Sequence, residues 1–460
     1  MTSSTLSTIS TAWDKVRLGD ALTLINGRAF KPTEWSQAGI PIVRIQNLNN
    51  PDASFNYYEG TLPEKFLLNT GDLLFAWSGT PGTSFGAHIW RGKKAWLNQH
   101  IFKIVFDENE FDKRFLQLAI NQNLQDYIFQ AHGGAGLAHI TKGKFENSGL
   151  PKPPLDLQKN IVAEIDKQFS RLDEAVANLK RVKANLKRYK AAVLKAAVEG
   201  RLVETEAELA RREGRSYETG AQLLQRILET RCSQRKGKGK YKEPAAPETT
   251  SLSELPKGWC WARLDAIAAL KGGITVDSKR KDKTARSVPY LRVANVQRGY
   301  LDLSEMKYIE APEADIKELR LQPGDILFNE GGDRDKLGRG WIWEDQLTDC
   351  IHQNHVFRAR LLLKDISPKL VSYWGNTFGK DYFLREGKQT TNLASINLTK
   401  LSAFPIPLPP VAEQFRIVAE IDRRLSLVRE VKAQVEANIL RAENLRQTIL
   451  KKAFTGKFIN

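Results

Sequence analysis

The chain has 460 residues, and its 70 Lys and Arg outnumber its 53 Asp and Glu, which gives a formal net charge of +17 and a pI near 9.6. Hydrophobic residues make up 41% of the sequence and ten residues are Trp, which excludes a disordered basic protein. The sequence has no run of about eighteen apolar residues, so we expect no membrane span, and the N-terminus does not have the pattern of a secretory signal. We therefore expect a globular protein of several domains whose partner is a polyanion, most commonly nucleic acid.

The cysteines and histidines do not predict a metal site or a disulfide framework. Cys232, Cys260 and Cys350 are odd in number and far apart in the sequence, which is typical of a protein from the reducing cytoplasm. His352 and His355 have the spacing of a ligand pair, but no third ligand is spaced to complete a zinc site. We expect no bound metal.

The first 154 residues have the pattern of a domain that mixes strands and helices. Short β-branched and aromatic runs at 40–45, 73–77 and 101–106 predict strands, because Gly, Asn, Asp and Pro turns separate them. The amphipathic stretch 111–129 predicts one helix. We therefore expect an α+β domain over residues 1–154.

A long helix is predicted next, over residues 155–200. A Pro-rich run at 151–154 precedes it and Gly200 closes it. Apolar residues recur every seven positions, which favours a coiled-coil seam. The predicted seam residues are Ile165, Phe169, Leu172, Leu179, Leu186 and Val193.

The same order of elements follows a connecting segment. Residues 201–250 have helical composition at first and then a basic stretch, and we expect a helical part followed by a flexible basic linker. A second α+β domain is predicted over 251–410, with one helix at 369–384, and a second long helix over 411–460. The seam residues of that helix are Ile421, Leu425, Val428, Val435 and Ile449.

The repeated order reflects a tandem duplication. Residues 151–200 align with 407–456 at a constant offset of 256, with 17 of 50 positions identical. Upstream the offset drifts between 246 and 255, which indicates insertions in a shared framework. The expected architecture is two α+β domains, each followed by a long helix, with the two helices paired as an antiparallel coiled coil of pseudo-two-fold symmetry. Two such readers at a set spacing suit two half-sites on duplex DNA.

The repeated blocks resemble the specificity subunits of type I restriction–modification enzymes, the HsdS family. The resemblance rests on Pro-x-Pro-Pro, Gln and Ile-Val-Ala-Glu-Ile-Asp at 151–166 and again at 407–422. The opening of the second domain at 255–259 and the Gly-Asp-Leu/Ile-Leu-Phe blocks at 71–75 and 324–328 also fit. The resemblance covers nearly the whole chain.

The resemblance implies a non-catalytic subunit that recognises a bipartite, asymmetric DNA site. Each α+β domain would be a target recognition domain for one half-site, and the helices, including the seam residues named above, would be the spacer and the docking surface for modification subunits. The implied partners are double-stranded DNA, two modification subunits and two restriction subunits, and no membrane. S-adenosylmethionine, ATP and Mg would be bound by those partner subunits, so that this chain would bind no cofactor.

The sequence contains no motif that would give the chain a reaction of its own. It has no Gly-x-x-x-x-Gly-Lys-Ser/Thr phosphate loop and no Asn/Asp-Pro-Pro-aromatic methyltransferase motif, and we expect no catalytic residues. The alternative is a stand-alone architectural or regulatory DNA-binding protein with coiled-coil spacing. The two hypotheses differ in whether the chain binds a specific site unaided.

Candidate DNA contacts are expected where the two domains diverge, because the half-sites differ. His100 and His355 are equivalent and are interpreted as framework residues. Arg44 and Arg292 are also equivalent, and either phosphate contact or a buried ion pair explains them. Arg and Lys suit phosphates and guanine, and Asn and Gln suit adenine. For each single residue the alternative is an ordinary solvated loop position. The candidates in the first domain are Arg28, Lys31, Arg44, Gln46, Asn47, Ser78, Thr80, Lys93, Lys94, His139, Lys142 and Lys144. Those in the second are Lys279, Arg280, Arg292, Asn295, Gln297, Arg298, Arg334, Lys336, Gln389, Thr390 and Asn392.

Overall fold

The chain divides into two compact units, which are described separately from a computed structural model. The first unit comprises residues 1–181 and 435–460, and the second comprises residues 182–434. Each unit thus contains one α+β domain and a part of both long helices, so the units cut across the segments expected from the sequence. The structure describes residues 13–50, 53–79, 83–124, 127–128, 138–234, 241–250, 252–275, 285–332, 336–389 and 394–455.

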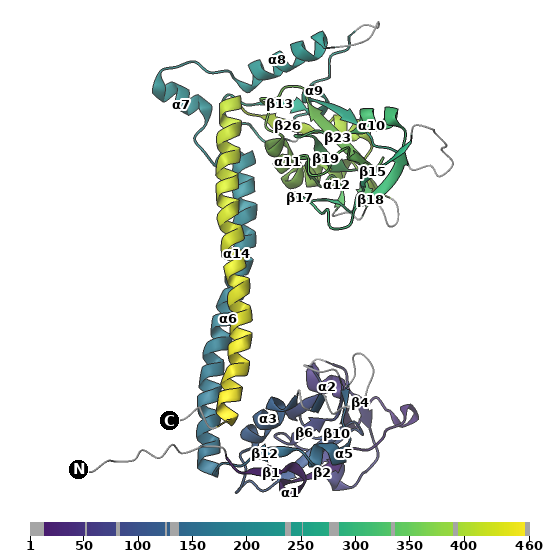
Figure 1. Cartoon of the computed structure of the whole chain (residues 1–460), viewed down its shortest axis with the longest axis vertical. Coiled ribbons are helices and arrows are strands. Elements are labelled where there is room, and N and C mark those ends of the chain that lie inside the picture. The colour runs from purple at the N-terminus through teal and green to yellow at the C-terminus, as the bar shows by residue number, and fades with distance from the viewer. Residues whose placement is uncertain are drawn as a thin grey trace, which may run out of the picture. The chain divides into compact units, whose positions relative to one another are not determined.

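The first unit is built on a four-stranded antiparallel sheet in the order β2-β10-β6-β8 (Figure 1). The strands span Leu22–Asn26 (β2), Ile101–Phe106 (β10), Leu73–Ala76 (β6) and Gly86–Ile89 (β8). Three of the four residues of β8 and all four of β6 are apolar or Gly, and β6 is buried throughout, as expected for a central strand. Helix α3 (Lys113–Gln122) packs on β8, and its N-cap Asp112 accepts a hydrogen bond from the Phe115 amide.

Smaller sheets complete the first domain. One has the order β4-β3-β9-β5, and two strand pairs join β1 to β12 and β7 to β11. The strands are β1 (Lys15–Arg17), β3 (Ile40–Val43), β4 (Asn56–Tyr58), β5 (Leu67–Leu68), β7 (Ser78–Gly79), β9 (Ala95–Leu97), β11 (Ala138–His139) and β12 (Gly149–Pro151). The short helices are α1 (Leu18–Ala21), η1 (Pro32–Glu34), α2 (Ile45–Asn49), η2 (Glu64–Phe66) and α5 (Lys142–Glu146).

The domain of the second unit repeats this framework. Its central sheet has the order β14-β23-β19-β21, again fully antiparallel, and β15 pairs with β18 and with β22. The strands are β13 (Cys260–Arg263), β14 (Ala268–Lys271), β15 (Arg286–Leu291), β16 (Val296–Gln297), β17 (Tyr300–Leu301), β18 (Lys307–Ala311), β19 (Ile326–Asn329), β20 (Gly331–Gly332), β21 (Gly340–Ile342), β22 (Ile351–His352), β23 (Val356–Leu361), β24 (Lys388–Gln389), β25 (Ala394–Ser395) and β26 (Pro405–Leu408). The domain's helices are α9 (Leu264–Ile267), α10 (Glu313–Leu319), α11 (Pro368–Thr377), α12 (Gly379–Glu386) and α13 (Leu398–Ser402). Because strands and helices pack together in both units, the α+β fold predicted from the sequence is confirmed.

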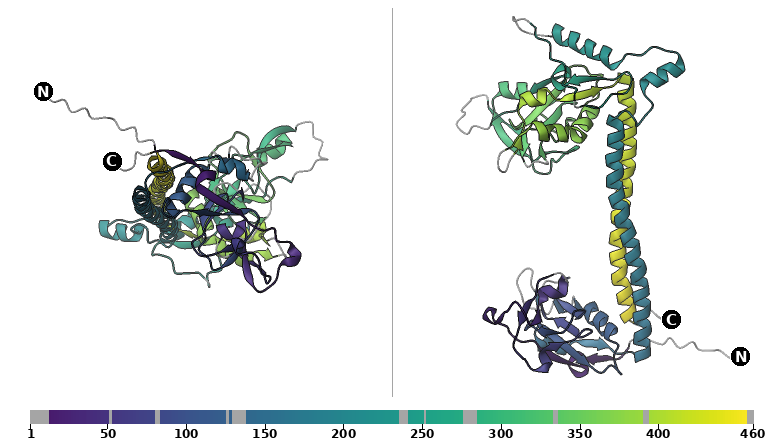
Figure 2. Two further views of the ribbon diagram at one scale, coloured as in Figure 1. Left: turned by 90° about the horizontal axis from the view of Figure 1, so that it is seen from below. Right: turned by 180° about the vertical axis from the view of Figure 1, so that it is seen from behind.

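The segment between the repeats belongs to the second unit. Helices α7 (Glu206–Glu213) and α8 (Gly220–Ser233) form in the first part of 201–250, where the composition is helical, and each begins with a capping box. Leu223 and Ile227 of α8 are fully buried in the core of the second domain. Figures 1 and 2 show α8 beside the strands and helices of that domain, and contacts join α8 to α9, β13 and β26. The basic stretch at 235–240 lies outside the described residues.

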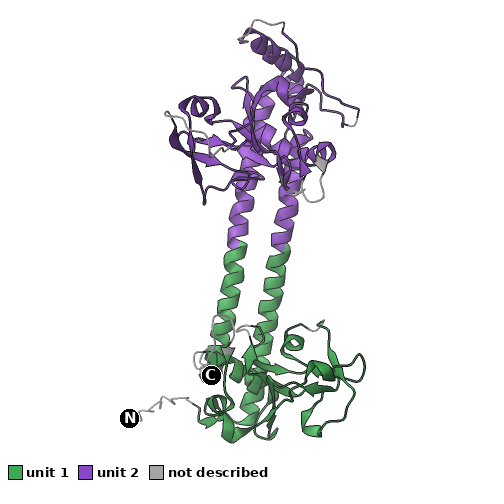
Figure 3. Ribbon diagram, turned by 90° about the vertical axis from the view of Figure 1, so that its right-hand side faces the viewer, with its two compact units in different colours: residues 1–181, 435–460 green, residues 182–434 purple. Residues whose placement is uncertain are grey.

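The two long helices are α6 (Leu155–Val198) and α14 (Val411–Phe454), and they lie side by side within each unit (Figure 3). In the first unit the start of α6 packs against the end of α14, since Ile165 and Phe169 share a core with Ile449. In the second unit the end of α6 packs against the start of α14, since Ala197 shares a core with Ile421. The predicted antiparallel pairing of the helices is therefore confirmed.

The predicted seam residues all lie in the less exposed part of the helix surface. The partner helix covers each seam residue only in part. A seam residue is therefore half-buried where no other element packs on the helix pair. Those that are buried are Ile165, Phe169, Val193, Ile421, Leu425, Val435 and Ile449. Those that are half-buried are Leu172, Leu179, Leu186 and Val428.

A repeated glutamine fastens each long helix to its domain. In the first unit the Gln158 amide donates to the Glu110 and Pro153 carbonyls at 2.9 and 2.8 Å and accepts from the Asp112 amide at 2.9 Å. In the second unit Gln414 donates to the Pro409 carbonyl and accepts from the Ser367 amide, both at 2.9 Å. Because each glutamine is fully buried, these bonds have no competition from water.

Candidate nucleic-acid interface

In the first unit, candidate DNA contacts meet where β6 ends. Ser78 of β7 pairs with His139 of β11, so two candidates from distant parts of the sequence are neighbours. Trp77 lies between two histidine rings, with its ring centroid 5.2 Å from that of His100 and 4.7 Å from that of His139. Burial, and then the charge of nearby His139, lower the pKa of His100. We call Trp77, Ser78, Gly79, His100 and His139 the first edge.

The second unit forms the same edge with different side chains. Glu330 follows β19 as Trp77 follows β6, and Gly331 of β20 pairs with Ser395 of β25. The His355 imidazole Nδ1 donates to Glu330 Oε2 at 2.6 Å. The side chains of Glu330 and His355 are 26% and 55% exposed, so both reach the solvent. We call Glu330, Gly331, His355 and Ser395 the second edge.

Backbone hydrogen bonds show that the two edges occupy the same place in the framework. The Trp77 amide donates to the His100 carbonyl at 3.3 Å, and the Glu330 amide donates to the His355 carbonyl at 2.9 Å. The carbonyls of Trp77 and Glu330 then accept from Ile140 and Ile396 at 3.0 and 2.8 Å. A shared backbone with unlike side chains is the pattern expected where two readers contact different bases.

Other candidates belong to the framework itself. Asn47 and Asn295 are buried, and each side-chain oxygen accepts from the backbone amide of the preceding arginine, Arg44 or Arg292, at 3.0 Å. Their amide nitrogens donate to backbone carbonyls in the following turn. These two asparagines therefore hold equivalent turns, and we leave them out of the proposed DNA contacts.

The equivalent arginines are half-buried and do not form a buried ion pair. Arg44 donates to Asn56 Oδ1 at 3.4 Å and lies over the Trp35 ring. Arg292 donates to the Glu305 carbonyl at 3.1 Å, with the Glu305 carboxylate 3.9 Å away. Among the neighbouring candidates, Gln46 is exposed. Gln297 and Arg298 donate to the carbonyls of Ala294 and Asn376, at 2.6 and 2.9 Å.

The turn after β2 places its two candidates differently. The Arg28 guanidinium is paired with the Glu34 carboxylate and lies over the Phe30 and Tyr58 rings. Hydrogen bonds from the Lys31 amide, and then from Arg28, lower the pKa of Glu34. The side chain of Lys31 is exposed, so it is the one of the pair that can contact a phosphate without breaking an ion pair.

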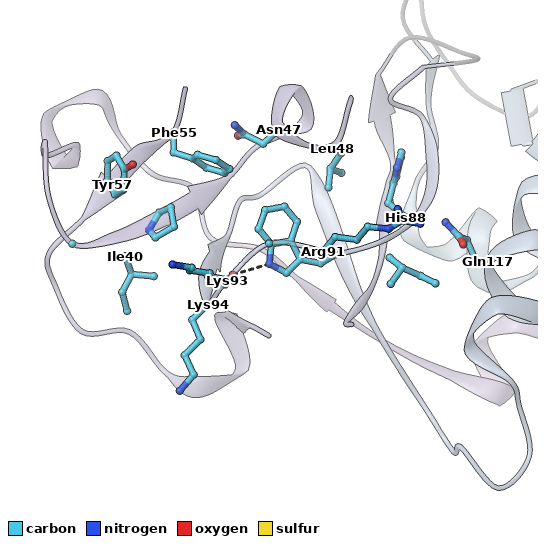
Figure 4. A pocket seen from close by; sticks show the side chains of 15 residues that line it. Ile40, Asn47, Leu48, Phe55, Tyr57, His88, Arg91, Lys93, Lys94 and Gln117 are labelled. Atoms are coloured by element: carbon cyan, nitrogen blue, oxygen red, sulfur yellow. Dashed lines mark hydrogen bonds between the residues drawn. The ribbon is translucent and has the colours of Figure 1, made fainter. Parts of the chain in front are cut away.

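Lys93 and Lys94 lie at the rim of an open pocket of about 910 Å³ in the first unit (Figure 4). The Trp90 indole nitrogen donates to the Lys93 carbonyl at 2.9 Å and fixes the turn. Burial lowers the pKa of His88, so this ring adds no positive charge near neutral pH. No acidic side chain is among the residues that line the pocket, which are Gly39, Ile40, Pro41, Asn47, Leu48, Phe55, Tyr57, His88, Ile89, Trp90, Arg91, Gly92, Lys93, Lys94 and Gln117.

The equivalent turn of the second unit has the opposite charge. Trp90 and Trp343 occupy the same place, because each amide donates to the equivalent aspartate carbonyl, that of Asp72 at 2.9 Å or Asp325 at 2.8 Å. Arg91-Gly92-Lys93-Lys94 follows Trp90, whereas Glu344-Asp345-Gln346 follows Trp343. The basic rim is therefore specific to the first unit.

The remaining candidates are close to the two edges or outside the described residues. Lys142 and Lys144 lie in α5, and Lys142 Nζ donates to the Leu24 carbonyl at 3.2 Å. Gln389 pairs through its backbone with Ala394 beside the second edge, and Lys336 follows β20. Thr80, Lys279, Arg280, Arg334, Thr390 and Asn392 lie outside the described residues.

Sequence reasoning missed Trp77 and Glu330. Both follow the repeated Gly-Asp-Leu/Ile-Leu-Phe block at the offset of 253 that relates Gly71 to Gly324, so extending that alignment by a few residues would have found them. It also missed Glu413, which is fully buried and accepts from the Trp259 indole and the Glu206 amide at 2.9 and 2.8 Å. Burial raises the pKa of Glu413.

The described residues contain no group of three or more His, Cys, Asp or Glu side chains arranged to bind a metal. His352 and His355 have separate partners, since His352 Nδ1 donates to the Val356 carbonyl at 2.7 Å. Within the same described ranges, no helix has the length and apolarity that crossing a membrane requires.

Comparisons with known proteins agree with the repeated architecture. Residues 11–188 match the family described as "Type I restriction modification DNA specificity domain". The chain is 25% identical to the EcoBI specificity subunit of Escherichia coli, over 98% of this chain and 87% of that subunit. It is 23% identical to the EcoKI specificity subunit of Escherichia coli strain K12, over 97% and 89% of the two chains.

Solved structures show the same fold over nearly the whole chain. A structure titled for the assembly of the type I R-M system matches with a TM-score of 0.66 and 17% identity, over 97% of this chain and 98% of that chain. The HsdS subunit of Thermoanaerobacter tengcongensis matches with a TM-score of 0.58 and 17% identity, over 97% of each chain. The chain is therefore similar to type I restriction enzyme specificity subunits over nearly its whole length, and its residues 11–188 match their DNA specificity domain.

Proposed function

We propose that the chain recognises a bipartite, asymmetric DNA site, with each unit reading one half. The observation that carries this proposal is the contrast between the two edges, where one backbone arrangement holds Trp77 and His139 in one unit and Glu330 and Ser395 in the other. A duplicated reader with equal side chains would favour two equal half-sites. The net charge of +17 supplies the attraction to phosphates that a DNA partner requires.

The chemistry of modification and cleavage belongs to partner subunits in this proposal. S-adenosylmethionine, ATP and Mg would be bound by those subunits, and double-stranded DNA by this chain. The three cysteines are free thiols, which fits a cytoplasmic complex. A stand-alone regulator is the competing function, and it differs in binding its DNA site without modification subunits.

The docking of modification subunits is assigned to outward-facing apolar side chains of the long helices. The predicted seam residues face the partner helix, so they hold the pair together and are less available to other proteins. Exposed apolar side chains elsewhere on α6 and α14 would lose contact with water on docking. They are Val182, Tyr189, Phe415, Leu427 and Val431 in the second unit and Leu440 and Leu445 in the first.

Exchanging residues 1–150 for the corresponding domain of a relative tests independent reading. Methylome sequencing of the host should then show a change in one half of the methylated motif and no change in the other. A change in both halves would refute independent reading. A host methylome that is the same with and without this chain would refute the function altogether.

Docking has its own test. Replacing Leu427 and Val431 with Ser should reduce co-purification of the modification subunit, and replacing Leu440 and Leu445 should do the same. The matched control is Lys432→Ser, which lies on the same exposed stretch of α14 but removes no apolar side chain. Full retention of the modification subunit by both double variants would place docking elsewhere.

A further inference from the structure

One framework position distinguishes the units most sharply, the residue that follows the central strand β6 or β19. Its backbone is fixed on both sides by equivalent hydrogen bonds, and a histidine of the shared framework lies beside it in both units. The first unit places the indole of Trp77 there, and the second places the carboxylate of Glu330. Because the backbone is the same, the difference between the units at this point is a difference of side-chain chemistry alone.

The carboxylate of Glu330 is held in place and has an unused oxygen. Oε2 accepts from His355 Nδ1 at 2.6 Å, which fixes the side chain. Among the described residues, Oε1 has no hydrogen-bond partner. An ionised carboxylate is an acceptor only, so the free oxygen selects a partner that donates a hydrogen.

We propose that Glu330 reads the exocyclic N4 amino group of a cytosine in the half-site of the second unit, with His355 as its positioning residue; this rests on the proposed function. In the major groove cytosine presents its N4 donor with no acceptor of its own beside it, adenine presents its N6 donor beside the N7 acceptor, which repels a carboxylate, and the O4 of thymine and the O6 of guanine are acceptors. A carboxylate facing either of those two oxygens gains no hydrogen bond and is repelled. The negative charge of Glu330 weakens the attraction to DNA phosphates, but it also disfavours bases that present an acceptor to the carboxylate. It therefore provides discrimination at one base pair.

The first unit has no carboxylate at this position and reads its base pair differently. Trp77 presents an aromatic ring flanked by His100 and by His139, which is exposed. Ser395 stands in the second unit where His139 stands in the first, since both pair with the strand that follows the central strand. The two half-sites therefore differ at the base pair that faces this position.

Methylome sequencing of the host with variant chains tests the proposal. Glu330→Ala should make one position of the second unit's half-site degenerate, with discrimination there falling roughly 5- to 150-fold. Glu330→Gln should shift the same position toward adenine, because a carboxamide both donates and accepts. His355→Ala should weaken discrimination at that position and at no other. The domain exchange of residues 1–150 identifies which half of the motif belongs to the second unit.

Glu310→Gln is the matched control, because Glu310 is an exposed glutamate of the same unit in β18. The methylated motif found with this variant should equal that found with the wild type. An unchanged motif in both Glu330 variants, or a change in the other half, overturns the proposal and leaves the proposed function standing. If methylation is lost at every site, the test is the affinity of the purified variant and wild-type complexes for four duplexes that differ in the base pair at that position. Equal affinity of the Glu330→Gln complex and the wild-type complex for all four duplexes then overturns it.

Discussion

His352 makes the stability of the second unit depend on pH in a way that a single substitution should remove. The residue lies in β22 and is fully buried, and its Nε2 has no hydrogen-bond partner among the described residues. Burial, more than the charge of nearby Arg358, lowers the pKa of His352 from 6.5 to about 4. The first unit has Leu97 at the equivalent place, because Val43 pairs with Leu97 as Leu291 pairs with His352.

The size of the effect follows from the lowered pKa. The unfolded chain binds a proton at His352 below about pH 6.5, whereas the folded chain does so only below about pH 4. Between those values the unfolded state holds more protons, so the stability of the second unit falls as the pH falls. A difference of about 2.5 pKa units corresponds to about 3 kcal/mol lost between pH 7 and pH 4.

The substitution His352→Leu removes this loss. At pH 7 the variant also loses the hydrogen bond to the Val356 carbonyl, at about 1 kcal/mol, and the unpaired Nε2, so we expect little net change there. Near pH 4 it should be more stable than the wild type by about 3 kcal/mol, which corresponds to a midpoint difference of roughly 6–12 °C for a unit of this size.

Differential scanning calorimetry of the full chain at several pH values between 7 and 4 measures the difference. The reciprocal variant Leu97→His is the control, since it should introduce the same acid sensitivity into the first unit and so identify which transition belongs to which unit. A His352→Leu variant whose midpoint falls with pH as steeply as that of the wild type would refute the reasoning, because burial of this ring would then not govern its protonation.

Three further predictions concern the connections between elements. Gln158→Ala leaves three backbone groups at one buried and two part-buried hydrogen bonds without this partner, so urea unfolding of the first unit should show a loss of about 3 kcal/mol, and a loss below 1 kcal/mol would contradict the fastening role. Arg416→Ala removes a 2.7 Å contact to the buried carboxylate of Glu206 and should cost about 2 kcal/mol, detected as faster proteolysis within α7 at equal cleavage elsewhere. Adding seven residues after both Leu179 and Val435 lengthens each helix by about 10 Å. The methylated motif should then gain about three base pairs between unchanged half-sites. An unchanged gap would show that helix length does not set the spacing.

The long-range organisation could be predicted from the sequence because repetition and periodicity report it directly. The heptads gave the seam of α6 and α14, and the constant offset over 151–200 and 407–456 gave their equivalence. The antiparallel direction followed from the duplication, since each helix leaves one domain and ends at the other. These features depend on residue class at many positions, so single exceptions do not obscure them.

Local interruptions were harder to predict, because single contacts decide them. Residues 369–384 were predicted as one helix, but the structure has two. Helix α11 ends at Thr377 and α12 begins at Gly379. Gly375 and Gly379 let the rings of Phe328 and Phe404 approach the backbone so closely that a Cβ would lie 2.9 Å from each ring. Hydrophobic periodicity continues through such a break and does not report it.

The candidate site shows the same limit. Residue type selected Asn47 and Asn295 as readers of adenine, but both amides are used within the fold. Residue type did not select Trp77, and a carboxylate such as Glu330 is an unusual choice in a basic protein. Only the paired frameworks of the two units show that these residues occupy one position, since their equivalence lies in backbone hydrogen bonds and not in residue type.

The opposite charges of the turns after Trp90 and Trp343 bear on how firmly each unit would hold a nucleic-acid backbone. Three cations follow Trp90, whereas two carboxylates occupy the equivalent turn. The phosphates of a duplex are arranged alike in both directions, so this difference alone favours neither orientation, and only contacts with bases can do so. It would instead make nonspecific attachment uneven, with the hold of the first unit weakening more steeply as the salt concentration rises.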